Sequence, residues 1–238
     1  MTRWRVGKSA LALMILGVVA TGCNGADTNG NTAATTSTSG PATTSTVGGD
    51  EMGLITTTAA AIEALPLALT PSQPEGPYYP VEKLDDQDSD LTAVVGLDGA
   101  PAGSVLLLRG QLLRSDGTPV AGGTIDIWQT DTRGIYLHPG DPKTADRDRF
   151  FQFSGVAVTD GEGAWSFRTI DPGYYEPRPR HIHVKVRVDG EAVLITQIYF
   201  SDDPETAGID ELLVAGVASG TDDQGRAVLV AEHRIVLP

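Results

Sequence analysis

Two histidines one residue apart, His181 and His183, close the stretch GYYEPRPRHIHVKV. In an extended strand, residues i and i+2 point to the same face, so both imidazoles can reach one point. Imidazole is the commonest metal ligand in proteins, and two imidazoles on one face provide half of a coordination sphere. We therefore predict a metal site at this histidine pair.

Tyrosines lie close to the histidine pair in sequence. Tyr136 ends the stretch DIWQTDTRGIY, and the adjacent Tyr174 and Tyr175 precede the histidines. Phenolate is a hard, anionic oxygen donor that suits Fe(III) and is uncommon on divalent metals. The combination of H-x-H with tyrosines favours a ferric site over a zinc site. The pattern alone leaves open whether Tyr174 or Tyr175 is the second oxygen donor.

The segments that must position these side chains read as β-strands. Short runs rich in Val, Ile and Leu alternate with Gly, Pro and Asp turns, and the Asp-Gly pairs at 160–161 and 189–190 are typical of hairpins. We predict a mostly β fold, an antiparallel β-sandwich in a prealbumin- or immunoglobulin-like arrangement, with little helix. The expected strands are Ser104–Leu113, Thr124–Gln129, Phe153–Thr159, Ala164–Thr169, His181–Val188, Ala192–Phe200 and Arg226–Leu237.

The N-terminus has the pattern of a secretory signal. Three basic residues in Met1–Lys8 precede the apolar run Ala10–Ala20, which is too short to span a bilayer comfortably, and small residues then lead into Cys23. Small residues directly before a cysteine indicate a bacterial lipoprotein signal at 1–23, with Cys23 lipidated. We expect an exported protein whose only membrane contact is a lipid anchor on the cell envelope.

Composition divides the rest of the chain into a tether and a folded domain. Residues 24–69 are rich in Thr, Ser, Gly and Ala, so we predict a disordered linker there and one domain at 70–238. The net charge is −14 at pH 7, and loss of the three bases in residues 1–23 makes it −17. This acidity argues against a nucleic-acid partner, which requires basic patches.

Five motifs occur in the order seen in intradiol ring-cleavage dioxygenases, the family of catechol- and protocatechuate-cleaving enzymes, and the chain most resembles their secreted, lipoprotein-like branch. The resemblance covers nearly all of the predicted domain. The motifs are TPSQPEGPYYP (70–80), DIWQTDTRGIY (126–136), VTDGEGAWSFRTIDPGYY (158–175), RPRHIHVKV (178–186) and TQIYF (196–200).

The resemblance implies a ligand set and a reaction. It places equatorial ligands of a non-haem Fe(III) ion at Tyr136 and His181, and axial ligands at Tyr175 and His183. The expected reaction is cleavage of a catechol-type diol by O₂ to a cis,cis-muconate-type dicarboxylate. Residues implied in catalysis or substrate binding, besides Tyr175 as the ligand that leaves, are Arg178, Gln197, Tyr78 and Tyr79.

The sequence also departs from the family pattern. Only five residues separate Tyr175 from His181, where cytosolic members carry a longer insertion over the pocket, and the helical dimerisation segment of the catechol 1,2-cleaving branch has no counterpart. These differences imply a more open pocket and leave open whether the chain forms a homo-oligomer. Two other functions remain open: a non-catalytic β-sandwich module that binds catechol-like or other ligands at the cell surface, and a copper or zinc site.

Overall fold

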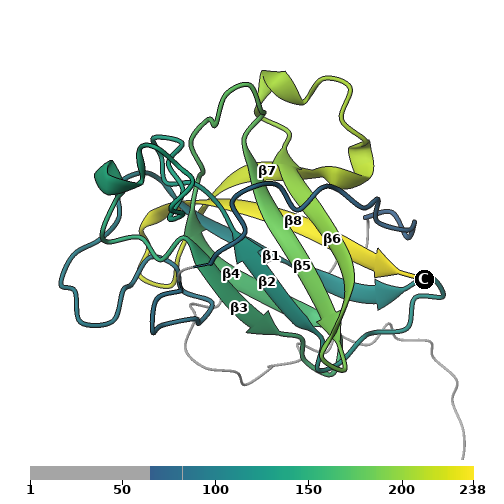
Figure 1. Ribbon diagram of the computed structural model, residues 1–238. Coiled ribbons are helices and arrows are strands. Elements are labelled where there is room, and N and C mark those ends of the chain that lie inside the picture. The colour runs from purple at the N-terminus through teal and green to yellow at the C-terminus, as the bar shows by residue number, and fades with distance from the viewer. Residues whose placement is uncertain (1–64, 82) are drawn as a thin grey trace, which may run out of the picture. The chain divides into compact units, whose positions relative to one another are not determined.

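Eight β-strands form the framework of the computed structural model, which describes residues 65–81 and 83–238 (Figure 1). No α-helix occurs in this part of the chain, so the prediction of a mostly β fold with little helix is confirmed. The strands are β1 Val105–Arg114, β2 Thr124–Trp128, β3 Ser154–Val158, β4 Ala164–Ile170, β5 His181–Val188, β6 Glu191–Phe200, β7 Val214–Thr221 and β8 Ala227–Leu237; the single-turn 3₁₀ helices are η1 Thr144–Asp146, η2 Pro204–Thr206 and η3 Glu211–Leu213.

The strands pair in the order β3-β2-β5-β6-β7-β8-β1-β4. The predicted sandwich is a mixed sheet rather than a purely antiparallel one, because β1 runs parallel to β8 and β6 runs parallel to β7. The β6–β7 contact comprises only the pairs Tyr199↔Val214 and Phe200↔Ala215, and the sheet turns there from one half to the other. Alternation along a sequence identifies a strand but not the direction of its neighbour.

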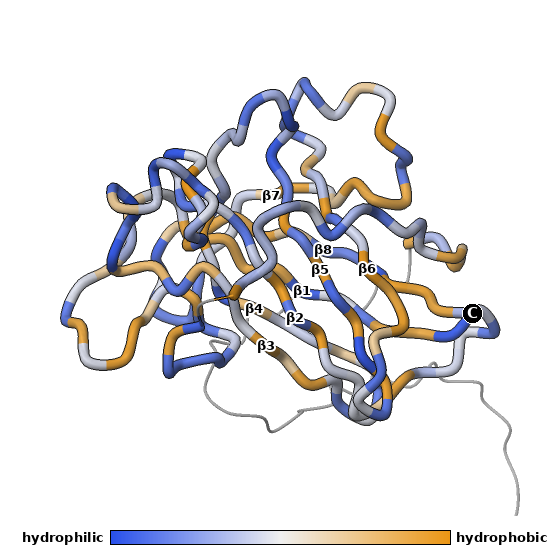
Figure 2. Tube along the Cα trace, viewed as in Figure 1, coloured by the Kyte–Doolittle hydropathy of each residue, from blue (hydrophilic) through white to orange (hydrophobic). Residues whose placement is uncertain are grey.

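One apolar core fills the space between the two halves of the sheet. It receives alternate side chains from β1, β4 and β8 on one side and from β2, β5 and β6 on the other. Figure 2 shows this pattern, with hydrophobic residues along the strands interrupted by hydrophilic ones. Burial of this kind is the main favourable contribution to folding.

Strand β5 uses its two faces differently. Ile182, Val184 and Val186 point into the core and are fully buried. The alternate residues His181 and His183 therefore point to the other face of the sheet. The hydrophobic positions fix this register, since a slip by one residue would move both imidazoles into the core.

An extended N-terminal segment packs along β6 and β8. The Thr70 N–H donates to the Val236 carbonyl over 3.0 Å, and the Gln73 N–H donates to the Ile195 carbonyl over 2.9 Å. The Thr196 hydroxyl donates to the Pro71 carbonyl over 2.7 Å. These bonds bring the following EGPYYP stretch to the face of β5 that carries the histidines.

The predicted signal peptide at 1–23, its lipidation site Cys23 and all but the last five residues of the predicted linker at 24–69 lie outside the described residues. No helix within the described ranges is long and apolar enough to cross a membrane.

His233 in β8 gives the fold a pH dependence that can be measured. Burial lowers its pKa to about 4, from 6.5 for an unperturbed histidine. The unfolded chain therefore binds this proton more readily, so the stability that neutral His233 contributes is complete above pH 6.5 and is lost as the pH falls towards 4. We expect a loss of about 2 kcal/mol at about pH 5.

Urea unfolding at neutral pH and at about pH 5 tests this expectation. The difference in unfolding free energy between the two pH values should be smaller in His233→Gln than in the unsubstituted protein. Equal differences in the two proteins would contradict it.

Candidate metal centre

The two histidines converge as the H-x-H pattern predicts. Their Nε2 atoms lie 3.2 Å apart, and the two residues are 6% and 5% exposed. The Nδ1 atom of His181 lies 2.7 Å from the Pro179 carbonyl oxygen, which can only accept, so Nδ1 carries the hydrogen and Nε2 carries the lone pair. Burial lowers the pKa of His181 to about 4 and that of His183 to about 2. Both imidazoles are neutral at pH 7, as metal binding requires.

Tyr136 brings a phenol oxygen to the same point. Its Oη lies 3.5 Å from Nε2 of His181, and the side chain is almost fully buried. Burial, followed by the nearby Tyr175, raises the pKa of Tyr136. A phenolate at this position therefore needs a cation beside it, and the two imidazoles cannot provide one at neutral pH.

Tyr175 lies beside Tyr136, with ring centroids 5.6 Å apart, and its Oη is 2.9 Å from Oη of Tyr78. The hydrogen bond to Tyr175, with a smaller contribution from burial, raises the pKa of Tyr78 to about 12. Tyr78 also packs on Tyr136 at 4.9 Å. Tyr174, the alternative donor, points elsewhere and donates its hydroxyl hydrogen to Asp203 over 2.8 Å.

Two buried aspartates shape the loop that carries Tyr136. Asp131 accepts from the N–H groups of Arg133, Ile135 and Asp148 at 2.8, 3.2 and 2.9 Å. Asp141 accepts from the Tyr136 N–H itself over 2.8 Å. Such side-chain bonds satisfy backbone groups that have no partner in a sheet, so they fix the loop without regular secondary structure.

Gly134 lets this loop approach the turn that carries the second tyrosine. Its φ is +74°, and a Cβ there would lie 1.8 Å from the Tyr174 carbonyl oxygen. A side chain at position 134 would therefore be strained and would push the two tyrosine-bearing loops apart.

The ring of His183 is held by its neighbours on both sides. Trp128 stacks on it with centroids 4.7 Å apart and an interplanar angle of 6°. On β2, Trp128 is the registered partner of His183, so strand pairing creates this stack. Gly76 of the N-terminal segment lies against the same imidazole, where a Cβ would come within 3.2 Å of Cε1.

A hydrogen-bonded group on β6 holds the predicted substrate arginine. Nη2 of Arg178 donates to Gln197 Oε1 over 2.8 Å and to Tyr199 Oη over 2.7 Å. Tyr199 in turn donates to Gln197 Oε1 over 2.8 Å, and Gln197 donates to the Pro74 carbonyl over 2.8 Å. The guanidinium is therefore preorganised beside the candidate ligands.

Sequence reasoning overlooked Tyr199. It is two residues from Gln197 and so shares its face of β6, and strand pairing places it opposite His181. The spacing in TQIYF could have indicated its face, but its contact with Arg178 depends on pairing that the sequence does not reveal.

The two tyrosines predicted to contact substrate have different surroundings. Tyr78 lies among the candidate ligands, as described above. The Tyr79 ring instead contacts Trp128 at 5.0 Å and the ammonium of Lys185 at 3.5 Å, and its hydroxyl accepts from Arg187 over 3.3 Å. Of the two, Tyr78 is therefore the better placed to touch a ligand at the centre.

The donor set fits a hard trivalent cation. Within the described ranges, no group of three or more His, Cys, Asp and Glu side chains could hold a metal, so the two imidazoles are complemented by phenol oxygens instead. The Nδ1 atom of His183 is buried without a hydrogen-bond partner among the described residues. The two Nε2 atoms lie 3.2 Å apart, close enough to bind one ion together. Two neutral nitrogens and two phenols suit Fe(III).

Comparison with known proteins finds a family model and curated relatives that match this chain. The family model described as Dioxygenase (Dioxygenase_C) matches residues 74–237. The chain is 37% identical over 136 residues to the protocatechuate 3,4-dioxygenase beta chain of Burkholderia cepacia, which covers 54% of this chain and 58% of the relative. It is 30% identical over 198 residues to the hydroxyquinol 1,2-dioxygenase of Rhizobium sp. (strain MTP-10005), which covers 74% of this chain and 64% of the relative. The chain thus spans somewhat less than two thirds of these curated relatives.

Solved structures share the fold. The dioxygenase domain of a dioxygenase carbohydrate-binding protein fusion from Streptomyces sp. SirexAA-E superimposes with a TM-score of 0.57 at 31% identity, covering 71% of this chain and 98% of that one. An intradiol ring-cleavage dioxygenase from Tetranychus urticae gives 0.55 at 23% identity, covering 71% and 94%, a likeness of fold alone.

Proposed function

The chain belongs to the intradiol ring-cleavage dioxygenase family, and on that premise we propose that it binds non-haem Fe(III) and uses O₂ to open a catechol ring between its two hydroxyl-bearing carbons. The product is a cis,cis-muconate-type dicarboxylate. The observation that supports this proposal most strongly is the convergence of the Tyr136 phenol oxygen and the two Nε2 atoms of His181 and His183.

Four side chains would hold the metal: Tyr136, Tyr175, His181 and His183. When bound there, Fe(III) supplies a Lewis acid that draws electron density from a catecholate and makes its ring reactive towards O₂. The chain's own contribution is a preorganised site in which both imidazoles are neutral and the donors need little rearrangement.

Tyr175 is placed to take a proton from the substrate. As a phenolate, its Oη can accept one hydroxyl hydrogen of an incoming catechol. Tyr78 Oη, 2.9 Å away, can then hold the resulting phenol by a hydrogen bond. Tyr78 thus gives Tyr175 a defined partner when the substrate takes its place.

Arg178 provides a fixed positive charge where negative charge develops on the substrate. Its bonds to Gln197 and Tyr199 hold it in place before the substrate binds. A preorganised donor of this kind stabilises the transition state by about 2–4 kcal/mol.

Oxygen consumption by the iron-reconstituted full chain tests the proposal. The substrates are catechol, protocatechuate and hydroxyquinol, with muconate-type absorbance followed in the same samples. We expect at least one diol to consume one O₂ per molecule of ring-opened product. Tight catechol binding without oxygen uptake would contradict the proposal and would favour a non-catalytic binding module.

We also propose that the protein is exported and lipid-anchored through Cys23, from the signal pattern of residues 1–23. Metabolic labelling with a fatty acid should mark the full-length chain and fail to mark Cys23→Ser. Equal labelling of both proteins would contradict the anchor.

A further inference from the structure

An open cavity of about 460 Å³ adjoins the arginine assigned to substrate binding. Its lining residues are Tyr174, Glu176, Pro177, Arg178 and Glu205. They come from two segments, the stretch from Tyr174 to Arg178 and the turn at η2. The cavity therefore shares Arg178 with the proposed substrate site.

Asp203 fixes the wall of the cavity. Its carboxylate is buried and accepts from the Tyr174 hydroxyl over 2.8 Å, the Arg180 N–H over 2.7 Å and the Glu205 N–H over 3.0 Å. One side chain thus joins the loop that carries Tyr174, the start of β5 and η2. The cavity is therefore a built feature of the fold rather than a gap between loose loops.

The outer part of the cavity is negatively charged. Glu176 and Glu205 are both exposed, and neither forms an ion pair within the part of the chain that the structure describes. Behind them Arg180 lies within ion-pair distance of three carboxylates, those of Asp171, Asp202 and Asp203, so this neighbouring group carries excess negative charge as well.

The positively charged Arg178 lies at the end of the cavity that adjoins the candidate ligands. Its Nη2 donates to Gln197 and Tyr199, which directs this edge of the guanidinium towards the candidate ligands. A carboxylate attached directly to the ring could still approach Arg178. A charged group two carbons further out would meet the two glutamates instead.

We propose that this cavity receives the ring substituent of the substrate and selects catechols whose side chain ends in a cation over those whose side chain ends in a carboxylate. The proposal rests on the proposed function and specifies its substrate class. Two carboxylates that form no ion pair among the described residues attract a protonated amine and repel an anion. The acidic charge of the whole chain acts in the same direction.

Three catechols whose side chains differ in terminal charge test the proposal. They carry a 2-aminoethyl, an ethyl or a 2-carboxyethyl group at ring position 4, and unsubstituted catechol is the reference. At an ionic strength of about 0.02 M, we expect kcat/KM to be about fivefold or more higher for the aminoethyl compound than for the carboxyethyl compound, with the ethyl compound between them. At about 0.5 M salt the ratio should fall towards one.

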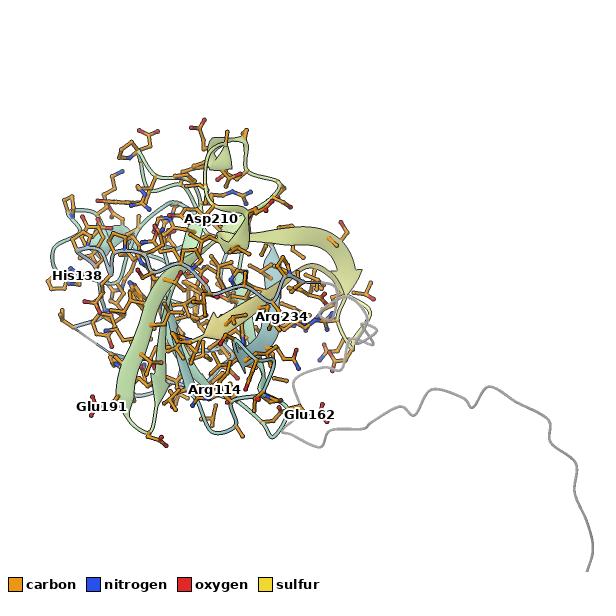
Figure 3. The ribbon with its side chains drawn as sticks, turned by 90° about the vertical axis from the view of Figure 1, so that its right-hand side faces the viewer. Arg114, His138, Glu162, Glu191, Asp210 and Arg234 are labelled. Carbon is orange, nitrogen blue, oxygen red and sulfur yellow. The ribbon has the colours of Figure 1, made fainter. Side chains whose placement is uncertain are left out.

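Variants locate the effect. The double substitution Glu176→Gln and Glu205→Gln should bring the ratio close to one at low salt. The control is Glu191→Gln, since Glu191 begins β6 at the opposite end of the β5–β6 hairpin from His181 (Figure 3). This control removes one negative charge from the chain, and the ratio should stay as in the unsubstituted protein.

The outcomes separate this inference from the proposed function. Turnover of catechol with a ratio of one or below, or a ratio that the double variant does not change, would overturn the inference and leave ring cleavage intact. If the protein shows no turnover, binding of the same compounds can be measured by calorimetry without oxygen. An aminoethyl preference in binding without any turnover would support the inference and overturn the proposed function.

Discussion

Replacing His183 with alanine is expected to abolish iron binding and to lower the rate of ring cleavage by about a thousandfold or more. His183 supplies one of two Nε2 atoms that lie 3.2 Å apart, and its ring is fixed by the parallel stack on Trp128. Alanine removes this nitrogen donor from the pair. Iron content per chain and kcat, measured on the same preparation, check this expectation.

The buried histidine outside the pair, His233, provides the control. His233→Gln removes an imidazole from β8, far along the chain from the centre, and should alter stability while keeping near-stoichiometric iron. If His183→Ala retained iron and activity comparable to those of His233→Gln, His183 would not be a ligand.

Replacing Tyr136 with phenylalanine is expected to weaken the visible absorption of the iron-loaded protein and to reduce kcat by about a hundredfold or more. The change removes only the phenol oxygen that lies 3.5 Å from Nε2 of His181 and keeps the ring that packs against Tyr78. Because the substitution is nearly isosteric, the unfolding free energy should change by less than about 1.5 kcal/mol. Visible spectra, steady-state kinetics and urea unfolding together separate the loss of a donor from a loss of structure.

Tyr78→Phe is the matched substitution. Tyr78 lies in the same cluster and contacts Tyr175 through its hydroxyl, but in the proposed arrangement it does not bind the metal. Its loss should leave the charge-transfer band in place and affect turnover through Tyr175. If Tyr78→Phe removed the band and Tyr136→Phe did not, the assignment of the oxygen donors would be reversed.

Local patterns in the sequence predicted the histidine face, and the structure shows why this was sufficient. The period of two along β5 sets Ile182 and Val184 in the core and the two imidazoles opposite, and no information from other strands is needed. The same reasoning gave most of the strands close to their observed bounds. It overlooked β7, because five of the eight residues of VAGVASGT are Gly, Ala or Ser and none is aromatic, which weakens the strand signal of its two valines.

Features that depend on strand pairing or on loop geometry could not be predicted from the sequence. The stack of Trp128 on His183 and the contact of Tyr199 with Arg178 require the registers of β2, β5 and β6. Alternation of apolar and polar residues does not indicate which neighbouring strands run parallel to each other. Tyr136 and Tyr175 come from loops held by aspartates, and the choice of Tyr175 over Tyr174 as the second oxygen donor came only from the resemblance to a family.

The difference between Tyr78 and Tyr79 has the same origin. These neighbours lie at a turn and point to different surroundings, and only Tyr78 lies among the candidate ligands. The motif that contains them could not assign these directions.

Metal analysis of the full chain purified without added metal, together with its visible spectrum, tests whether the centre holds Fe(III). We expect iron to be the dominant metal, close to one per chain, with the burgundy-red absorption of tyrosinate bound to Fe(III). Near-stoichiometric zinc in a colourless protein would contradict it.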